Sequence, residues 1–214
     1  MNIKAILFDL DGTILNTLAD LTDSLNAVLQ SEGYETRHAE EVRTFAGEGY
    51  VVLVGRALPE KTPPAEIQRC AELFRQMYLK NMTNKTKPYD GILPVLDHLK
   101  ETGIRIGVVS NKMDIATKET CIHYFGNRID IALGDTPLRK RKPAPDNLLE
   151  AMRLLECDAS ETLFVGDSDI DVQAAKQANV PCAGVTWGFQ SEQTLRKEGA
   201  DYIIHEPGEL LSLL

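Results

Sequence analysis

The chain has 214 residues and a formal net charge of −9 at pH 7, with 32 acidic and 23 basic side chains. Because nucleic acids and anionic membrane surfaces recruit basic proteins, this balance argues against both as partners. A hydrophobic content of 43% and a charged content of 26% are ordinary for a globular protein, and the length suits one α/β domain with a modest insertion.

The first predicted element is a strand over Ala5–Phe8, an apolar run typical of a buried strand in a parallel sheet. Two carboxylates, Asp9 and Asp11, follow it directly. Like charges at the end of a buried strand need a neutralising partner, and Mg²⁺, which carboxylates hold together with waters and phosphate oxygens, is the best candidate. Gly12 allows a sharp turn, and Thr13 adds an amide and a hydroxyl. The stretch indicates the floor of a phosphate-handling site, with an exposed acidic turn as the alternative.

A run of helices is expected next, in three segments with helical spacing of apolar residues: 17–30, 40–58 and 65–79. A Gly-Glu-Gly sequence at 47–49 interrupts the second segment, and no alternating strand pattern occurs before Pro88. We therefore expect a small helical cap subdomain over residues 16–86, inserted into a catalytic core that is formed by residues 1–15 and 87–214.

Strands and helices alternate after Pro88. The predicted strands cover residues 105–109, 129–133, 162–165, 182–185 and 202–204. The predicted helices that separate them cover residues 93–100, 114–123, 145–155 and 170–178. Such alternation is typical of a parallel sheet with right-handed crossovers. The predicted fold class is therefore α/β, a Rossmann-like parallel sheet in a three-layer α/β/α core with an inserted all-helical cap.

Polar residues also end two of the later strands. Ser110 and Asn111 follow the strand 105–109, and Asp167 follows the strand 162–165. Ligands of open α/β sheets bind outside the carboxyl ends of the strands, so these groups and the two N-terminal aspartates should face one crevice. For Asp167 the alternative is a capping role at the start of the next helix.

Four motifs, in this order along the chain, resemble those of the haloacid dehalogenase-like hydrolase superfamily, and specifically its Mg²⁺-dependent phosphatases with a helical cap. They are DLDGTI at 9–14, VVSN at 108–111, Lys142 within KPAP, and VGDSDID at 165–171. The resemblance covers nearly the whole chain. Within the superfamily, Gly-x-Gly at 47–49 and KPYDG at 87–91 are similar to the phosphoglycolate phosphatase-like subgroup.

The resemblance implies a mechanism. Asp9 would be the nucleophile that attacks phosphorus and forms an aspartyl-phosphate, which divides one difficult displacement into two easier ones. Asp11 would protonate the leaving alcohol and then deprotonate the attacking water. Mg²⁺ would bind the Asp9 carboxylate, the Asp11 backbone carbonyl and Asp167. Lys142 would balance the charge of Asp9 and of the transferred phosphoryl group.

Other site residues follow from the same resemblance. Phosphate or substrate contacts are expected from six residues: Gly12, Thr13, Ser110, Asn111, Gly47 and Gly49. Asp171 would play a supporting role, by pairing with Lys142 or with a metal-bound water. The two cap glycines would form a substrate-specificity loop, although a simple helix interruption is the alternative reading. One of Arg43, Thr44 and Arg56, which lie near this loop in sequence, could meet a substrate carboxylate, because Arg binds carboxylates bidentately.

The expected activity is that of a Mg²⁺-dependent phosphatase of a small phosphomonoester, with 2-phosphoglycolate as the best substrate analogy. Asp11 argues against a dehalogenase or a phosphonatase, because those members of the superfamily lack an aspartate at this position. A phosphomutase of the β-phosphoglucomutase type and an inorganic pyrophosphatase stay open as alternatives. A non-catalytic phosphate-binding module is disfavoured, because every motif position holds a chemically competent residue.

The sequence does not predict secretion or membrane insertion. Residues 1–8 lack a positively charged leader, and no apolar stretch reaches membrane-spanning length. The four cysteines are scattered without metal-site spacing and are expected to be free thiols in a reducing compartment. We expect a cytoplasmic monomer or weak dimer that acts on a small phosphorylated metabolite. Trp187 and Phe189 are expected to pack rather than to contact substrate.

Overall fold

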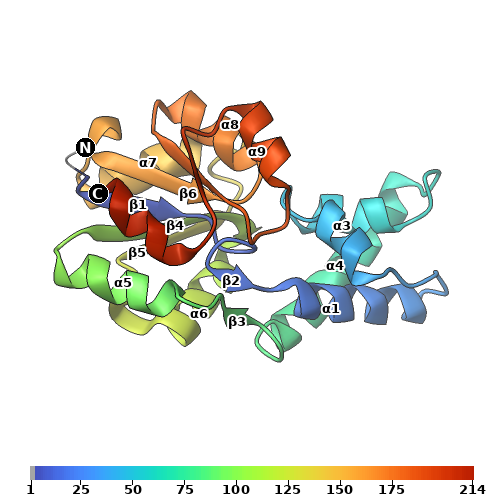
Figure 1. The fold of residues 1–214 in the computed structure, drawn as a ribbon. Helices are drawn as coiled ribbons and strands as arrows, with labels where there is room; N and C mark the ends of the chain where they lie inside the picture. Colours follow the sequence, from blue (N-terminus) through green and yellow to red (C-terminus); the bar gives the residue numbers. More distant parts are fainter. Residues whose placement is uncertain (1–2) are drawn as a thin grey trace.

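The computed structural model describes residues 3–214 and contains a six-stranded parallel sheet between two layers of helices (Figure 1). The strands, in the spatial order β5-β4-β1-β6-β7-β8, are β5 (Ile131–Asp135), β4 (Arg105–Met113), β1 (Ala5–Phe8), β6 (Thr162–Gly166), β7 (Cys182–Val185) and β8 (Tyr202–Ile204). Phe8, the last residue of β1, pairs with Val108 and with Val165. The polar residues that follow these three positions are therefore neighbours in space. The predicted Rossmann-like α/β fold class is confirmed.

Helices cover both faces of the sheet because the central strand is apolar on both faces. In β1, Ile6 and Phe8 pack toward one helical layer, whereas Ala5 and Leu7 pack toward the other. The first layer contains α5 (Ile92–Glu101), α6 (Asp114–Phe125) and the short 3₁₀ helix η3 (Pro207–Leu213); the second contains α7 (Asp146–Leu155), α8 (Asp169–Ala178) and α9 (Glu192–Glu198). Each buried Leu, Ile or Phe contributes roughly 1.5–3 kcal/mol, so these two faces hold the sheet rigidly.

Four helices lie to one side of the sheet and form a third apolar cluster (Figure 1). They are α1 (Leu18–Ser31), α2 (Ala39–Phe45), α3 (Tyr50–Ala57) and α4 (Pro64–Asn81), and they separate the two-residue antiparallel strands β2 (Leu15–Asn16) and β3 (Lys87–Pro88). Buried Asp20 of α1 accepts hydrogen bonds from the backbone amides of Lys85 and Thr86, at 2.8–3.0 Å. This carboxylate ties the start of the helical insert to its return segment. The division of the chain at residues 16 and 87 stays a prediction.

The observed elements differ from the predicted ones where local sequence is a weak guide. The strand predicted over 105–109 continues to Met113, with an irregular register after Val109, so Ser110 and Asn111 lie within β4. The strand predicted over 129–133 is shifted by two residues, because the short 3₁₀ helix η1 (Gly126–Arg128) precedes it. Six short elements were not predicted: β2, β3, η1, η2 (Ala159–Glu161), α9 and η3. They are too short for a clear apolar period.

None of the helices within residues 3–214 combines the length and the apolar character that a bilayer span requires. All four cysteines are free and buried. Trp187 packs against the first helical layer, as expected, and its indole N–H donates to the backbone carbonyl of Thr13 at 2.9 Å. Phe189, by contrast, was expected only to pack, and it lines a pocket.

Candidate active site

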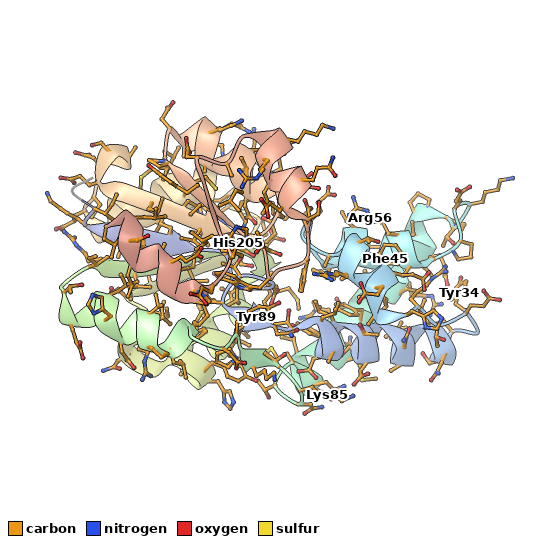
Figure 2. All side chains as sticks on the ribbon, in the orientation of Figure 1. Tyr34, Phe45, Arg56, Lys85, Tyr89 and His205 are labelled. Carbon is orange, nitrogen blue, oxygen red and sulfur yellow. The ribbon has the colours of Figure 1, made fainter. Side chains whose placement is uncertain are left out.

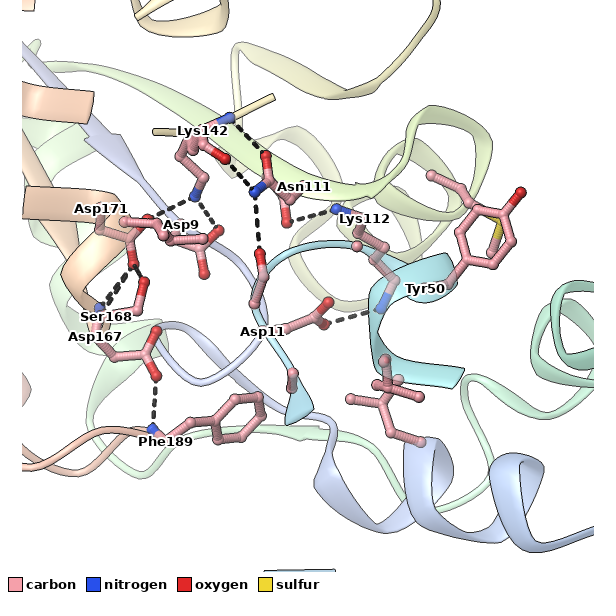
Figure 3. Close-up of a pocket in the computed structure, with 18 of the residues that line it drawn as sticks. Asp9, Asp11, Tyr50, Asn111, Lys112, Lys142, Asp167, Ser168, Asp171 and Phe189 are labelled. Atoms are coloured by element: carbon pink, nitrogen blue, oxygen red, sulfur yellow. Dashed lines mark hydrogen bonds and ion pairs between the residues drawn. The ribbon is translucent and has the colours of Figure 1, made fainter. Parts of the chain in front are cut away.

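A pocket opens at the carboxyl ends of β1, β4 and β6, between the sheet and the four helices of the insert (Figure 3). Asp9 directly follows β1, Asp167 directly follows β6, and Lys142 lies in the segment that precedes α7. Side chains of α3 and α4, including Tyr50 and Tyr78, close the opposite side. The sheet thus supplies charged groups to one end of the pocket, and the helical insert supplies aromatic and aliphatic walls to the other.

Lys142 joins two carboxylates at the sheet end of this pocket. Its Nζ lies 2.6 Å from Asp9 Oδ1 and 2.7 Å from Asp171 Oδ1, and it donates to the Val109 carbonyl at 3.0 Å. Burial opposes the charge of Lys142, but the two carboxylates outweigh it and raise the pKa of the ammonium above its usual value. Burial raises the pKa of Asp9 to about 7, Asp171 adds to this, and Lys142 opposes it.

Asp171 is bonded at both carboxylate oxygens. Oδ1 accepts from Lys142, and Oδ2 accepts from the Asp167 amide at 3.2 Å, the Ser168 amide at 3.1 Å and the Ser168 hydroxyl at 2.5 Å. Ser168 and Asp171 form the capping box that begins α8. The side chain therefore fixes Lys142 against the helix N-terminus, and its oxygens have little capacity left for another ligand.

Asp167 is held from two sides at the rim of the pocket. Its Oδ1 accepts from the Thr13 hydroxyl at 3.1 Å, and its Oδ2 accepts from the Phe189 amide at 2.6 Å. A Cβ added at Gly12 or at Gly188 would overlap this carboxylate, so both positions need glycine; Gly12 also has a φ of +92°. Gly12 and Thr13 were predicted to bind phosphate, but the Thr13 hydroxyl is used to orient Asp167.

The acidic cluster fits a hard divalent cation. Asp9, Asp167 and Asp171 are all buried, and each can offer a carboxylate oxygen within 4.8 Å of the others. Burial, together with the charges of Asp171 and Asp9, raises the pKa of Asp167 well above its usual value. The three carboxylates have one lysine, Lys142, in their cluster. When all three are ionised, the cluster therefore carries excess negative charge that a cation would neutralise. Oxygen donors of this kind suit Mg²⁺, and Asp9 and Asp167, which accept one and two hydrogen bonds against four for Asp171, have the most lone pairs to offer.

Asp11 points away from this cluster, toward the helical insert (Figure 3). Its Oδ1 lies 2.9 Å from Lys112 Nζ, and the same ammonium lies 2.5 Å from the hydroxyl of Tyr78 on α4. The prediction of Asp11 as a metal ligand therefore concerns its backbone carbonyl alone. Neither Lys112 nor Tyr78 was singled out from the sequence. Lys112 directly follows the Ser-Asn pair of the second motif, which is a signal that could have identified it.

Asn111 uses its whole side-chain amide within the protein. Nδ2 donates to the carbonyls of Gly47, at 3.0 Å, and Lys142, at 2.9 Å, while Oδ1 accepts from the Lys142 amide at 2.8 Å. The predicted phosphate contact of Asn111 thus has a competing structural use, in which it joins the glycine segment of the insert to the Lys142 segment. Gly47, Gly49 and Ser110 line the pocket.

The polar residues proposed to reach a substrate carboxylate face elsewhere. The Arg43 guanidinium donates to the backbone carbonyls of Phe189, at 3.0 Å, and Gly188. Arg56 lies beside Phe45 (Figure 2) and pairs with Glu48. The Thr44 hydroxyl donates to a carbonyl of its own helix at 2.7 Å. None of the three lines the pocket, and each has a partner elsewhere, so the contact of one of them with a substrate carboxylate stays a prediction that this arrangement does not favour.

Buried aspartates and a lysine at the carboxyl ends of a parallel sheet are typical of an α/β protein that handles phosphate groups. The model of the haloacid dehalogenase-like hydrolase family matches residues 6–185, and the chain belongs to this family. This confirms the resemblance noted in the motifs.

Several known proteins are similar to this chain over its whole length. Phosphoglycolate phosphatase of Aquifex aeolicus is 31% identical over 212 residues, which cover 99% of this chain and 96% of that protein. A Caldanaerobacter subterraneus protein with the provisional name pyrophosphatase PpaX is 33% identical over 216 residues, covering 100% and 96%. The crystal structure of a predicted phosphoglycolate phosphatase from Haemophilus somnus superposes with a TM-score of 0.92 at 27% identity, covering 100% and 98%. The chain is an enzyme, a phosphoric monoester hydrolase.

Proposed function

We propose that the protein is a Mg²⁺-dependent phosphatase that hydrolyses a small phosphomonoester, with 2-phosphoglycolate as the best candidate, through a phosphoryl group carried on Asp9. One observation carries this proposal: buried Asp9 shares Lys142 with Asp171, at 2.6 and 2.7 Å, beside the carboxylate of Asp167. The substrate rests on full-length relatives that bear the name phosphoglycolate phosphatase.

Asp9 Oδ2 is the attacking atom. Oδ1 is bonded to Lys142, whereas Oδ2 has no hydrogen-bond partner among residues 3–214. As Oδ2 bonds to phosphorus, the bond to the ester oxygen breaks and Asp11 gives that oxygen its proton. Asp11 then takes a proton from a water that attacks phosphorus, the bond to Asp9 breaks, and inorganic phosphate leaves.

Charge compensation is the main contribution of the surrounding groups. The Lys142 ammonium neutralises Asp9, so the anionic phosphate can approach an anionic nucleophile. Asp9, Asp167 and the backbone carbonyl of Asp11 would hold Mg²⁺, which would screen the phosphoryl oxygens. Asp171 keeps Lys142 in place through the hydrogen bond at 2.7 Å.

The helical insert, residues 16–86, serves as a cap in this proposal. The Gly47 carbonyl meets Asn111, and the Arg43 guanidinium meets the 188–189 segment, so the cap contacts the core on both sides of the pocket. Such closure excludes water while the phosphoryl group is on Asp9. Residues 1–15 and 87–214 form the catalytic core beneath it.

The direct test is phosphate release from 2-phosphoglycolate, other small phosphomonoesters and pyrophosphate, with Mg²⁺ and with chelator. We expect Mg²⁺-dependent release and a preference for 2-phosphoglycolate of at least about tenfold in kcat/KM, or about 1.4 kcal/mol in the transition state. A preference for pyrophosphate would favour the second candidate, inorganic pyrophosphatase, which the Caldanaerobacter relative supports. Turnover of a sugar phosphate without phosphate release would indicate a phosphomutase and contradict the proposal.

A further inference from the structure

The pocket has a second cationic group that the proposed chemistry leaves unused. Among its described lining residues only Lys112 and Lys142 carry a positive charge. Lys142 Nζ already meets Asp9, Asp171 and the Val109 carbonyl, so its three N–H donors are occupied. In Figure 3, Lys112 and Lys142 lie on opposite sides of Asp11, and Lys112 is on the side that faces the helical insert.

The Lys112 side chain is buried, with 3% of its surface exposed. Its Nζ lies 2.9 Å from Asp11 Oδ1, 2.5 Å from the Tyr78 hydroxyl and 4.7 Å from the centroid of the Tyr78 ring. An ammonium has three donors, and these two hydrogen bonds use two of them. The third donor of the ammonium has no partner among the described residues and is free for an anion that enters the pocket.

The surroundings of Lys112 suit an anion on the part of the substrate that leaves. The cap side of the pocket is lined by Leu21, Leu53 and Phe74, which offer no charge. Arg43 and Arg56, the nearby cap arginines, are bonded outside the pocket. An anionic group that enters this side therefore has one cationic partner within reach.

The position of Asp11 limits the length of such a substrate. In the proposed mechanism Asp11 protonates the ester oxygen, and Lys112 Nζ lies 2.9 Å from an oxygen of that same carboxylate. The ester oxygen and an anion bound to Lys112 must therefore be only a few bonds apart. A 2-phospho hydroxy acid, with one carbon between the ester oxygen and the carboxylate, meets this condition, whereas a long or neutral alcohol does not.

We propose that Lys112, held by Tyr78, is the subsite that binds a carboxylate on the leaving alcohol and so selects short phosphorylated hydroxy acids. This inference rests on the proposed phosphatase function and deepens it. Lys112 determines specificity, and Tyr78 positions its ammonium.

The test compares two esters that differ only at the anionic group, 2-phosphoglycolate and 2-hydroxyethyl phosphate, with p-nitrophenyl phosphate as a third, non-selective substrate. The readout is kcat/KM for 2-phosphoglycolate divided by kcat/KM for 2-hydroxyethyl phosphate. A change at Asp11 that affects the hydrolysis of both esters equally cancels in this ratio. We expect a ratio of at least about ten in the wild type and a loss of about tenfold or more in Lys112→Met, mainly because the carboxylate-bearing ester binds less tightly and its KM rises. Lys118→Met, on the exposed face of α6, is the matched control and should keep the wild-type ratio.

A wild-type ratio in Lys112→Met would overturn the inference. If Lys112→Met does not fold, Lys112→Gln, which keeps hydrogen-bonding atoms for Asp11 and Tyr78 but no charge, gives the same test. A wild type that hydrolyses p-nitrophenyl phosphate with Mg²⁺ but shows no preference between the two alkyl esters would overturn the subsite and leave the phosphatase proposal standing. Absence of all hydrolysis would overturn the proposed function and the inference with it.

Discussion

At the scale of single residues, three aspartates of one pocket differ in the partners that surround them. Asp171 is bonded at both oxygens, Asp167 is bonded at both oxygens by single neutral donors, and Asp9 shares one oxygen with Lys142. Asp11, two residues beyond Asp9, faces Lys112 instead. In the proposed mechanism, partners rather than residue type would therefore distinguish the nucleophile Asp9, the metal ligand Asp167, the positioning group Asp171 and the acid Asp11.

Replacement of the nucleophile tests these assignments. Asp9→Asn keeps the size of the side chain but removes the anionic oxygen, so we expect turnover of p-nitrophenyl phosphate to fall by more than about 10³-fold. Steady-state kinetics with Mg²⁺ measures the loss. Asp23→Asn, an exposed residue of α1 that pairs with Lys85, should retain wild-type turnover. Wild-type-like activity in Asp9→Asn would contradict the mechanism.

Gly188 offers a steric test of Asp167. A Cβ at Gly188 would overlap the Asp167 carboxylate, whereas a Cβ at Gly208 has open space, and neither glycine has a positive φ. Gly188→Ala should displace the carboxylate and lower Mg²⁺-dependent kcat/KM by about 10²-fold, since displacements of about 1 Å cost that much. Gly208→Ala should stay within about twofold of the wild type. Equal activities in the two variants would show that the position of Asp167 is unimportant.

At the scale of elements, helix α2 of the insert contacts the segment that holds Asp167. The Arg43 guanidinium donates to the carbonyls of Gly188 and Phe189, and the Phe189 amide donates to Asp167 at 2.6 Å. One peptide segment therefore lies between a cap residue and a candidate metal ligand. Through it, the position of the cap can affect the orientation of Asp167.

Removal of this contact should weaken Mg²⁺ binding. Hydrogen bonds from a charged donor contribute roughly 1.5–3 kcal/mol, so the loss of part of this energy in Arg43→Ala should raise the Mg²⁺ concentration for half-maximal rate by about threefold to tenfold. A Mg²⁺ titration of phosphatase activity measures it. Arg75→Ala, which breaks an exposed pair with Glu72 on α4, is the control and should not shift the titration. An unchanged midpoint in Arg43→Ala would exclude the coupling.

Some of these elements and contacts could be predicted from the amino-acid sequence, whereas others could not. The strands that directly precede Asp9 and Asp167 were predictable, because apolar runs mark buried strands locally and a parallel sheet brings their ends together. The pairing of Lys112 with Tyr78 and that of Arg43 with Phe189 were not, since each joins elements of different parts of the fold. The side-chain use of Asn111 was unpredictable for the same reason.

At the scale of the whole molecule, the buried acidic cluster links stability to pH and to metal. The pKa of Asp9 is raised from 3.8 to about 7, so between these values the folded protein holds a proton that the unfolded chain has lost. Stability of the metal-free protein therefore falls as pH rises through this window. Asp167 acts in the same direction. Mg²⁺ needs the ionised carboxylates, so it should stabilise the protein more at higher pH.

Thermal unfolding with Mg²⁺ and with chelator at pH 5, 6, 7 and 8 measures this linkage. We expect Tm of the chelated protein to fall as pH rises across the window given by the Asp9 pKa, and the Mg²⁺-induced rise in Tm to grow with pH. Asp9→Asn, which has no titrating group at this position, should show a shallower slope. A Mg²⁺-induced shift that does not change with pH would contradict the assignment of these carboxylates to the metal.

The central claim, that Asp9 carries the phosphoryl group, is tested most directly by trapping that group. Asp11→Asn should still react with p-nitrophenyl phosphate, whose leaving group needs no proton, but should hydrolyse the intermediate slowly. Acid quenching during turnover with Mg²⁺, followed by peptide mass spectrometry, should find the mass of one phosphoryl group on Asp9, and none when Asp9→Asn is added to the variant. A phosphoryl group on another residue, or continued turnover with no phosphorylated protein, would contradict the account.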